Sequence, residues 1–285
     1  VPLTSVLHRL DVPMDCEVLA AAPGSGFRFI HRTLAGAEVY FVSNQQAATQ
    51  RVRCLFRVTG IAPELWDPVS GRIVRLENCQ VVDRRTMVPI EFGPRQSFFV
   101  VFRKAASEPA AAAVSCDRAF PALKPAAELG GPWDVSFDPK WGGPRHIVFE
   151  QLVDWAKHPS EPVRHYSGTV TYRRAFDTPA PAAGAAPAGR LYLDLGTVHN
   201  VARVRLNGKD LGVVWCAPWR VDITGSVRPK DNRLEIDVVN LWPNRLIGDA
   251  GLPPDKRFTR TNVAFSKDQP LLPSGLIGPV TIQHE

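Results

Sequence analysis

Short stretches in which apolar and polar residues alternate recur along almost the whole chain, and Gly, Asn and Pro residues separate them. A period of two predicts β-strands with one buried face, and short strands at this spacing are typical of an antiparallel sandwich. Residues 3–10 are the exception and allow a short N-terminal helix. We therefore predict an all-β fold. The alternating segments are 27–31, 38–43, 51–59, 81–90, 97–102, 133–137, 168–176, 190–195, 201–206, 211–214, 219–223 and 233–240.

The chain is long enough for two cores. Its 285 residues with 45% hydrophobic content leave little room for an enzyme barrel in addition. An Ala-rich stretch with one Pro, residues 105–114, reads as a linker. We predict one β-sandwich over residues 1–104 and a second over 115–285. In the second, Asn207-Gly208 predicts a tight hairpin turn and residues 178–189 predict an exposed loop.

Charge and cysteine usage exclude several classes of protein. The net charge of +6 comes from scattered Lys and Arg residues, which argues against a nucleic-acid partner. Five widely separated cysteines without a CxxC pair indicate neither a zinc site nor a dense disulfide framework, and most are expected to be small core residues.

Nothing in the sequence indicates a membrane partner. No apolar run approaches the roughly 18 residues of a membrane helix. The start of the chain has neither Met nor a signal pattern, as a mature fragment would, so the compartment stays open.

Compact catalytic motifs are missing from the sequence. It contains no GxSxG, no HExxH, no P-loop and no GxGxxG after a strand. His158 and His165 lie seven residues apart, but Pro159 and Pro162 break any helix that would place them on one face. A metal site at these histidines is therefore disfavoured.

Carboxylates could still support glycoside hydrolysis, which uses two carboxyl groups about 5 to 9.5 Å apart. Glu150, Asp154 and Glu161 lie in one loop-like region and Asp249 lies in another. For each of these four catalytic candidates, a surface or structural role is the more common alternative.

Aromatic and amide side chains supply candidates for saccharide binding. Trp155 lies in a polar, aperiodic segment and is the best candidate for a stacking platform, whereas Trp133, Trp219 and Trp242 are expected in the core. Polar candidates for hydroxyl recognition are His158, His165, Asn240, Asn244, Arg245, Asp249, Arg257, Arg260 and Asn262. The Asn, Arg and Asp side chains could instead satisfy the backbone of a long irregular loop.

Two longer stretches carry a family resemblance. Residues 194–224, with Val201–Gly212 at their centre, resemble the galactose-binding-like jelly roll of glycoside hydrolase family 2. Residues 239–249 and 271–280 resemble the ending of proteins grouped with the α-L-rhamnosidases of family 106. The resemblance implies that the second domain is a galactose-binding-like jelly roll.

The first domain agrees, since residues 29–32, 39–44 and 64–71 resemble the β-domain that follows the catalytic barrel in those proteins. That barrel carries the catalytic carboxylates, and no alternating strand-helix pattern is found in this sequence. The resemblance therefore implies an upstream catalytic domain as a partner. It also implies a periplasmic or secreted location and allows a structural calcium ion.

Three functions follow as hypotheses. The first is a carbohydrate-binding or accessory role with a saccharide ligand. The second is a small glycosidase that uses two of the four carboxylates, so that the chain, if active, is a glycoside hydrolase. The third is a structural interface that packs on a catalytic barrel.

Overall fold

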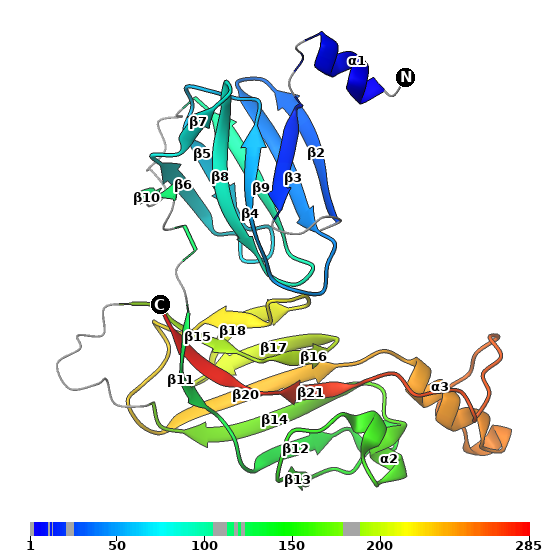
Figure 1. Cartoon of the computed structure of the whole chain (residues 1–285). Coiled ribbons are helices and arrows are strands. Elements are labelled where there is room, and N and C mark those ends of the chain that lie inside the picture. Colours follow the sequence, from blue (N-terminus) through cyan, green and yellow to red (C-terminus); the bar gives the residue numbers. More distant parts are fainter. Residues whose placement is uncertain are drawn as a thin grey trace. The chain divides into compact units, whose positions relative to one another are not determined.

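The computed structural model describes residues 3–10, 12, 14–20, 26–104, 113–116, 119–120, 123–178 and 189–285. These residues form two compact units, Val1–Ala122 and Leu123–Glu285 (Figure 1). The second unit begins later than the expected residue 115, because Ala113–Ser115 pairs with a strand of the first unit. Most of the expected linker, residues 105–112, lies outside the described residues, as do residues 179–188 of the expected loop.

The first unit is built from two sheets, in the orders β1-β4-β8-β7 and β10-β6-β5-β9-β3-β2. Its helix α1 (Leu3–Arg9) confirms the expected N-terminal helix. All strand pairs are antiparallel except β10 with β6. The strands are β1 (Cys16–Ala20), β2 (Phe27–Leu34), β3 (Ala37–Asn44), β4 (Gln50–Phe56), β5 (Pro63–Trp66), β6 (Ile73–Glu77), β7 (Gln80–Val82), β8 (Arg85–Phe92), β9 (Ser97–Arg103) and β10 (Ala113–Ser115).

The core of the first unit lies between these two sheets. Strand β8 alternates regularly between half-buried and buried residues, so Val88, Ile90 and Phe92 all point inward. They join Tyr40 and Phe102 of the other sheet in one apolar cluster. The unit is therefore a β-sandwich, as predicted.

The cysteines divide into two kinds. Cys16 and Cys54 are buried in the core, as expected, and burial raises the pKa of the Cys16 thiol to about 12. Cys79 and Cys116 form a disulfide with a Cα–Cα distance of 5.3 Å, which the sequence did not indicate. Because Cys116 directly follows β10, the disulfide holds this last strand to the turn after β6.

The second unit also has two principal sheets, in the orders β11-β22-β15-β19 and β13-β12-β14-β20-β17-β18, with a small β16-β21 pair. Its strands are β11 (Lys124–Glu128), β12 (Trp133–Phe137), β13 (Ile147–Phe149), β14 (Thr169–Phe176), β15 (Leu191–Asp194), β16 (Thr197–His199), β17 (Val201–Leu206), β18 (Lys209–Val214), β19 (Arg220–Asp222), β20 (Asn232–Val239), β21 (Gly275–Gly278) and β22 (Thr281–His284). Its helical elements are η2 (Pro139–Trp141), η3 (Trp155–Lys157), α2 (Glu161–Arg164), α3 (Pro243–Ala250) and η4 (Pro254–Lys256).

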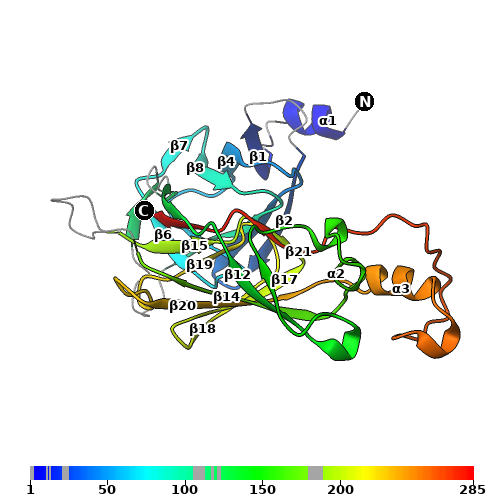
Figure 2. The same ribbon diagram turned by 90° about the horizontal axis from the view of Figure 1, so that it is seen from below.

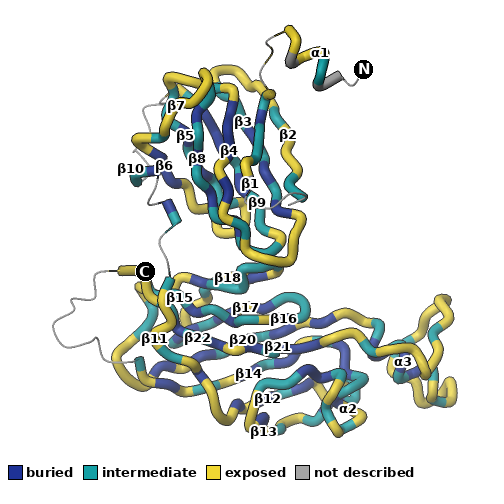
Figure 3. The backbone as a smooth tube through the Cα atoms, viewed as in Figure 1, coloured by how far each residue is buried: buried dark blue, intermediate teal, exposed yellow. Residues whose placement is uncertain are grey.

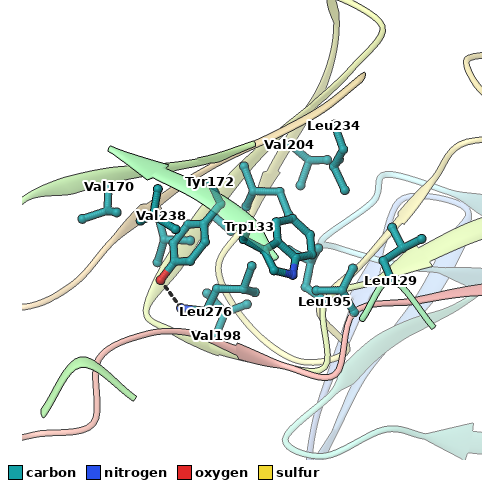
Figure 4. Packing of buried hydrophobic residues seen from close by; sticks show 14 of the residues in the cluster. Leu129, Trp133, Val170, Tyr172, Leu195, Val198, Val204, Leu234, Val238 and Leu276 are labelled. Atoms are coloured by element: carbon teal, nitrogen blue, oxygen red, sulfur yellow. Dashed lines mark hydrogen bonds between the residues drawn. The ribbon is translucent and has the colours of Figure 1, made fainter. Parts of the chain in front are cut away.

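The core of the second unit contains inward residues of both principal sheets. Trp133 and Tyr172 lie at its centre and contact each other edge to face (Figure 4). Leu193 and Ile282 of the opposite sheet belong to the same cluster. Buried strand centres and exposed loops are evident in Figure 3. The expected β-sandwich and all-β class are confirmed.

The hairpin at Asn207-Gly208 has the predicted form. Leu206 pairs with Lys209, so only two residues form the turn, and both have positive φ (54° and 81°). Asn and Gly tolerate this backbone region. No helix among the described residues is long and apolar enough to cross a membrane.

Replacing both bridged cysteines by alanine (Cys79→Ala with Cys116→Ala) should destabilise the first unit. The bridge spans a sequence separation of 37, so its loss should lower the free energy of unfolding by about 3 to 4 kcal/mol in urea titrations. Cys216→Ala, which leaves the bridge intact, is the control. A loss below about 1 kcal/mol for the double variant would mean that β10 is held by strand pairing alone.

Candidate functional site

Most of the predicted site residues gather at one end of the second unit. Helices α2 and α3 lie side by side there in both views (Figures 1 and 2), and an added Cβ on Gly248 of α3 would lie 2.7 Å from the Cβ of His165. The segment before β21 contacts both η3, which precedes α2, and α3: the backbone N–H of Trp155 in η3 donates to the Ser274 carbonyl over 3.0 Å, and the Asn244 side chain of α3 donates to the Leu272 carbonyl over 2.7 Å. Three segments that are distant in sequence thus form one structure.

Four buried polar residues connect these segments, and we call Asp154, Asn240, Asn244 and Ser274 the polar network. The Ser274 hydroxyl accepts hydrogen bonds from the side-chain amides of Asn240 (3.2 Å) and Asn244 (3.0 Å). The Asp154 carboxylate accepts one from the Ser274 N–H over 2.9 Å. Buried polar groups without partners are costly, so these side chains hold one another in place.

The two asparagines of the polar network also satisfy the backbone. Asn240 accepts from the Gly168 N–H (3.0 Å) and donates to the Tyr166 carbonyl (2.9 Å). Asn244 bonds both the N–H (2.8 Å) and the carbonyl (2.7 Å) of Leu272. Of the two roles that the sequence allowed, these hydrogen bonds fit the structural one, and both side chains are buried.

Helix α3 replaces part of the expected irregular loop after Asn240. Pro243 occupies its first turn, where the missing N–H has no intrahelical partner to lose. Arg245 forms a buried ion pair with Asp249 over 3.0 Å. Asp249 also accepts hydrogen bonds from the N–H (2.8 Å) and hydroxyl (2.6 Å) of Thr259. Burial lowers the pKa of Arg245, and the Asp249 charge opposes that shift.

Trp155 is not an exposed platform, which corrects the sequence-based expectation. Its side chain is fully buried (0% exposed), and the indole N–H donates to the Tyr172 hydroxyl over 2.6 Å. Gly275 leaves the space for the ring, since an added Cβ would lie 2.3 Å from the indole nitrogen. The polar neighbours of Trp155 in sequence reflect a short 3-10 turn that Asp154 caps, with the ring pointing inward.

The four candidate carboxylates occupy different environments. Glu150 and Glu161 are exposed, and Glu161 lies 3.5 Å from Arg164. Asp154 and Asp249 are buried and bind the backbone and Arg245, as described above. Two of the four candidates therefore have structural partners, and the other two lie at the surface.

The two histidines are half-buried and face different neighbours. His158 stacks on Phe149 with ring centroids 5.3 Å apart and accepts a hydrogen bond from the Ser160 N–H. Burial lowers the pKa of both His158 and His165, helped by Arg164 for the former and by Arg245 for the latter. The lowered pKa favours the neutral form of both side chains.

No metal centre is found among the described residues, where no three His, Cys, Asp or Glu side chains come together. A calcium site would take its carboxylate ligands from a group of Asp and Glu side chains of this kind. Calcium therefore remains a prediction of the resemblance alone.

Three candidates remain at the surface. Arg257, Arg260 and Asn262 are exposed in the loop that follows α3. Arg257 donates to the Leu252 carbonyl over 3.0 Å. These side chains are open to solvent, unlike the polar network beneath α3.

A group of three rings at the same end, two of them exposed, escaped the sequence reasoning. Trp141, Trp242 and Phe258 form what we call the aromatic cluster. The Trp141 and Trp242 rings meet edge to face at 5.2 Å. Gly142, in a left-handed conformation, lies so close to Phe258 that an added Cβ would be 2.7 Å from its ring.

Two of the three rings are open to solvent, whereas Trp141 is half-buried and packs against the core. Trp242 is 47% exposed and Phe258 is 41% exposed. The Lys140 ammonium lies 5.6 Å from the centre of the Trp141 ring, and the Arg245 guanidinium lies 4.7 Å from that of Phe258. The core position expected for Trp242 is therefore wrong, because the residue precedes α3 and lies beyond the end of β20. Trp133, in contrast, is buried as expected.

Family models match both units in part. A family 106 α-L-rhamnosidase model matches residues 1–79, and a glycosyl hydrolase 2 galactose-binding domain-like model matches residues 159–253. The second match contains the whole of α2 and α3, and so includes part of this end of the unit.

Two similar proteins are described as glycosidases, and this chain spans only a small part of each. A putative beta-glucuronidase from Formosa agariphila is 36% identical over 178 residues, which are 54% of this chain and 15% of that protein. The structure of a rhamnosidase from Novosphingobium sp. PP1Y is 37% identical and superposes with a TM-score of 0.84 over 99% of this chain. This chain covers 26% of that rhamnosidase. The chain therefore resembles accessory β-domains of much longer glycoside hydrolases.

The burial of Trp155 predicts a structural role that can be measured. Trp155→Ala should lower the free energy of unfolding by about 3 to 5 kcal/mol, because it opens a core cavity and removes one of the two N–H donors, Trp155 and Leu276, that bind the Tyr172 hydroxyl. The matched control is Trp215→Ala, whose ring is 61% exposed and whose loss should cost under about 0.5 kcal/mol. Equal losses in the two variants would contradict the assigned burial.

Proposed function

We propose that the chain binds a saccharide at the aromatic cluster and thereby serves as an accessory part of a larger glycoside hydrolase. The observation that carries the proposal is the exposure of Trp242 and Phe258 beside Trp141. Large aromatic rings that stay exposed to solvent in a well-packed domain form an apolar surface that a ligand can cover.

The geometry of the aromatic cluster fits a sugar ring. Sugars present apolar C–H faces to aromatic rings and hydroxyl groups around their edges. The edge-to-face contact of Trp141 and Trp242 creates an angled surface rather than a flat one. Lys140, whose ammonium lies over Trp141, supplies a hydrogen-bond donor at its border.

The ligand class follows from the relatives. One is described as a rhamnosidase and another as a putative beta-glucuronidase, so rhamnosides and glucuronides are the first ligands to try. Binding by one small surface of this kind should be weak to moderate. The partner that benefits from this saccharide binding would be an upstream catalytic domain.

A structural interface is the second candidate function, and a specific observation favours it. Leu241 and Leu272 are also exposed at this end of the unit, next to the polar network residues Asn240 and Asn244. Exposed aliphatic side chains contribute to protein interfaces and form no specific contacts with hydroxyl groups. In this case the aromatic cluster would pack against the catalytic domain.

Catalysis by the chain itself has less support. The candidate carboxylates are either exposed singly or used to hold the backbone and Arg245. We therefore assign hydrolysis to the upstream partner rather than to these β-domains.

The disulfide supports a location outside the cytosol. Bonds such as Cys79–Cys116 persist in oxidising compartments and are rare where thiols are kept reduced. We propose the periplasm or the extracellular medium.

Removing one ring tests the proposed site. Trp242→Ala should weaken binding of a rhamnose-containing or glucuronide oligosaccharide about tenfold in calorimetric titrations, because a stacking surface is lost. Folding should be unaffected, and Trp215→Ala, which removes an exposed Trp elsewhere, should bind as the unmodified chain does.

Two outcomes would contradict the proposal. If the unmodified chain binds neither class of oligosaccharide, the saccharide role fails. If the chain binds but Trp242→Ala binds equally well, the site is elsewhere. An interface is favoured if Trp242→Ala instead weakens association with a separately expressed catalytic portion of a relative.

A further inference from the structure

A second hollow surface of the second unit lies on the outer face of its six-stranded sheet. Two adjoining hollows of about 350 and 500 Å³ share Asp134, Arg173, Arg174 and Ala175. The larger extends across β14 and β20 to β17. We call the residues used below, Asp134, Arg173, Arg205, Arg233 and Glu235, the arginine groove.

The strand register explains why charged side chains meet there. Residues of β20 alternate, so Arg233 and Glu235 face out while Leu234 and Ile236 enter the core. Glu235 pairs with Arg173 of β14 on one side and with Arg205 of β17 on the other. The three form one row across the sheet, with side chains within contact distance of one another.

Glu235 holds two guanidinium groups in fixed positions. Its carboxylate binds Arg173 over 2.8 Å and Arg205 over 2.6 Å. Asp237 provides a further contact to Arg205 over 2.8 Å. Each guanidinium carries five N–H donors, so both arginines keep donors for a ligand without needing to be ordered by it.

Arg233 differs from these two arginines. Within the described part of the chain, its side chain forms no hydrogen bond or ion pair, and the residue is exposed. Its cross-strand neighbour on β14 is Ala175, which is too small to cover it. A guanidinium in a hollow beside already oriented arginines is placed to bind an anion bidentately.

The charge pattern selects among anions. Four arginines and only two carboxylates, Asp134 and Glu235, line the larger hollow, which leaves a positive excess. The carboxylates would repel a ligand with a phosphate at every residue, such as a nucleic acid. They would accept hydrogen bonds from hydroxyl groups placed between well-separated anionic groups.

We propose that the arginine groove binds an acidic oligosaccharide, with Arg233 holding its carboxylate or sulfate group and Asp134 and Glu235 accepting its hydroxyls. This site is separate from the aromatic cluster and does not require it. A carboxylate and a sulfate group both present several oxygens to which a guanidinium can donate at once. The experiment therefore includes one probe of each kind.

The test is calorimetric titration of the whole chain at about 150 mM salt. The probes are a short oligogalacturonate, its carboxyl-reduced neutral counterpart, a sulfated galactan oligosaccharide and single-stranded DNA. We expect the uronate or the sulfated probe to bind and the neutral counterpart to bind at least about tenfold more weakly. Whichever acidic probe binds more tightly identifies the anionic group.

Variants locate the binding. Arg233→Ala should weaken binding of the acidic probe about tenfold, and Arg233→Lys should restore only part of it because an ammonium lacks the planar fork. Arg145→Ala removes the same charge from another exposed position of this unit and should change binding less than about twofold. Arg233 is exposed, so its loss should leave the unfolding transition in place.

Several results would overturn the proposal. These are equal binding of the neutral probe, equal losses in Arg233→Ala and Arg145→Ala, tighter binding of DNA, or no binding of either acidic probe. Trp242→Ala separates this proposal from the previous one, since groove binding should survive it. If Trp242→Ala abolishes binding of the acidic probe and Arg233→Ala does not, the ligand is at the aromatic cluster and the groove proposal fails.

Discussion

The hydrogen bonds that converge on the Ser274 hydroxyl hold together the end of the second unit that carries the candidate site. Asn240 directly follows strand β20, Asn244 lies in α3, and Ser274 directly precedes β21, so one hydroxyl joins the beginning of a long excursion to its end. Each removed partner would leave a buried amide unsatisfied, at about 1 to 3 kcal/mol. The excursion is therefore a fixed part of the sandwich, although it lies outside both sheets.

This attachment determines which side chains can meet a ligand. The polar groups point inward and are used by the backbone, while the rings of Trp242 and Phe258 stay at the surface above them. A fixed support also reduces the entropy lost on binding, because the rings need no ordering. On the outer face of the six-stranded sheet of the same domain, cross-strand pairs orient the arginine groove, so a single sandwich carries an apolar surface and a charged one.

The sequence predicted what depends on local pattern. Alternation predicted strands with one buried face, Trp133 was expected in the core, and Asn207-Gly208 predicted a hairpin, since these features are decided within a few residues. Contacts between segments that are distant in sequence could not be predicted from local pattern. Cys79 meets Cys116 only because β10 returns beside β6. Trp155 and Trp242 exchanged their expected roles because local polarity does not report the direction of a ring, which for Trp155 is set by Gly275 and Tyr172.

The central claim is that a saccharide contacts the exposed rings and not the polar residues beneath them. The indole N–H signals in a ¹H–¹⁵N correlation spectrum test it directly, because each tryptophan gives its own peak. Addition of a rhamnose-containing or glucuronide oligosaccharide should shift the peaks of Trp141 and Trp242 and leave that of buried Trp155 in place. Unchanged Trp141 and Trp242 peaks at saturating ligand, or a shift confined to Trp155, would contradict the account.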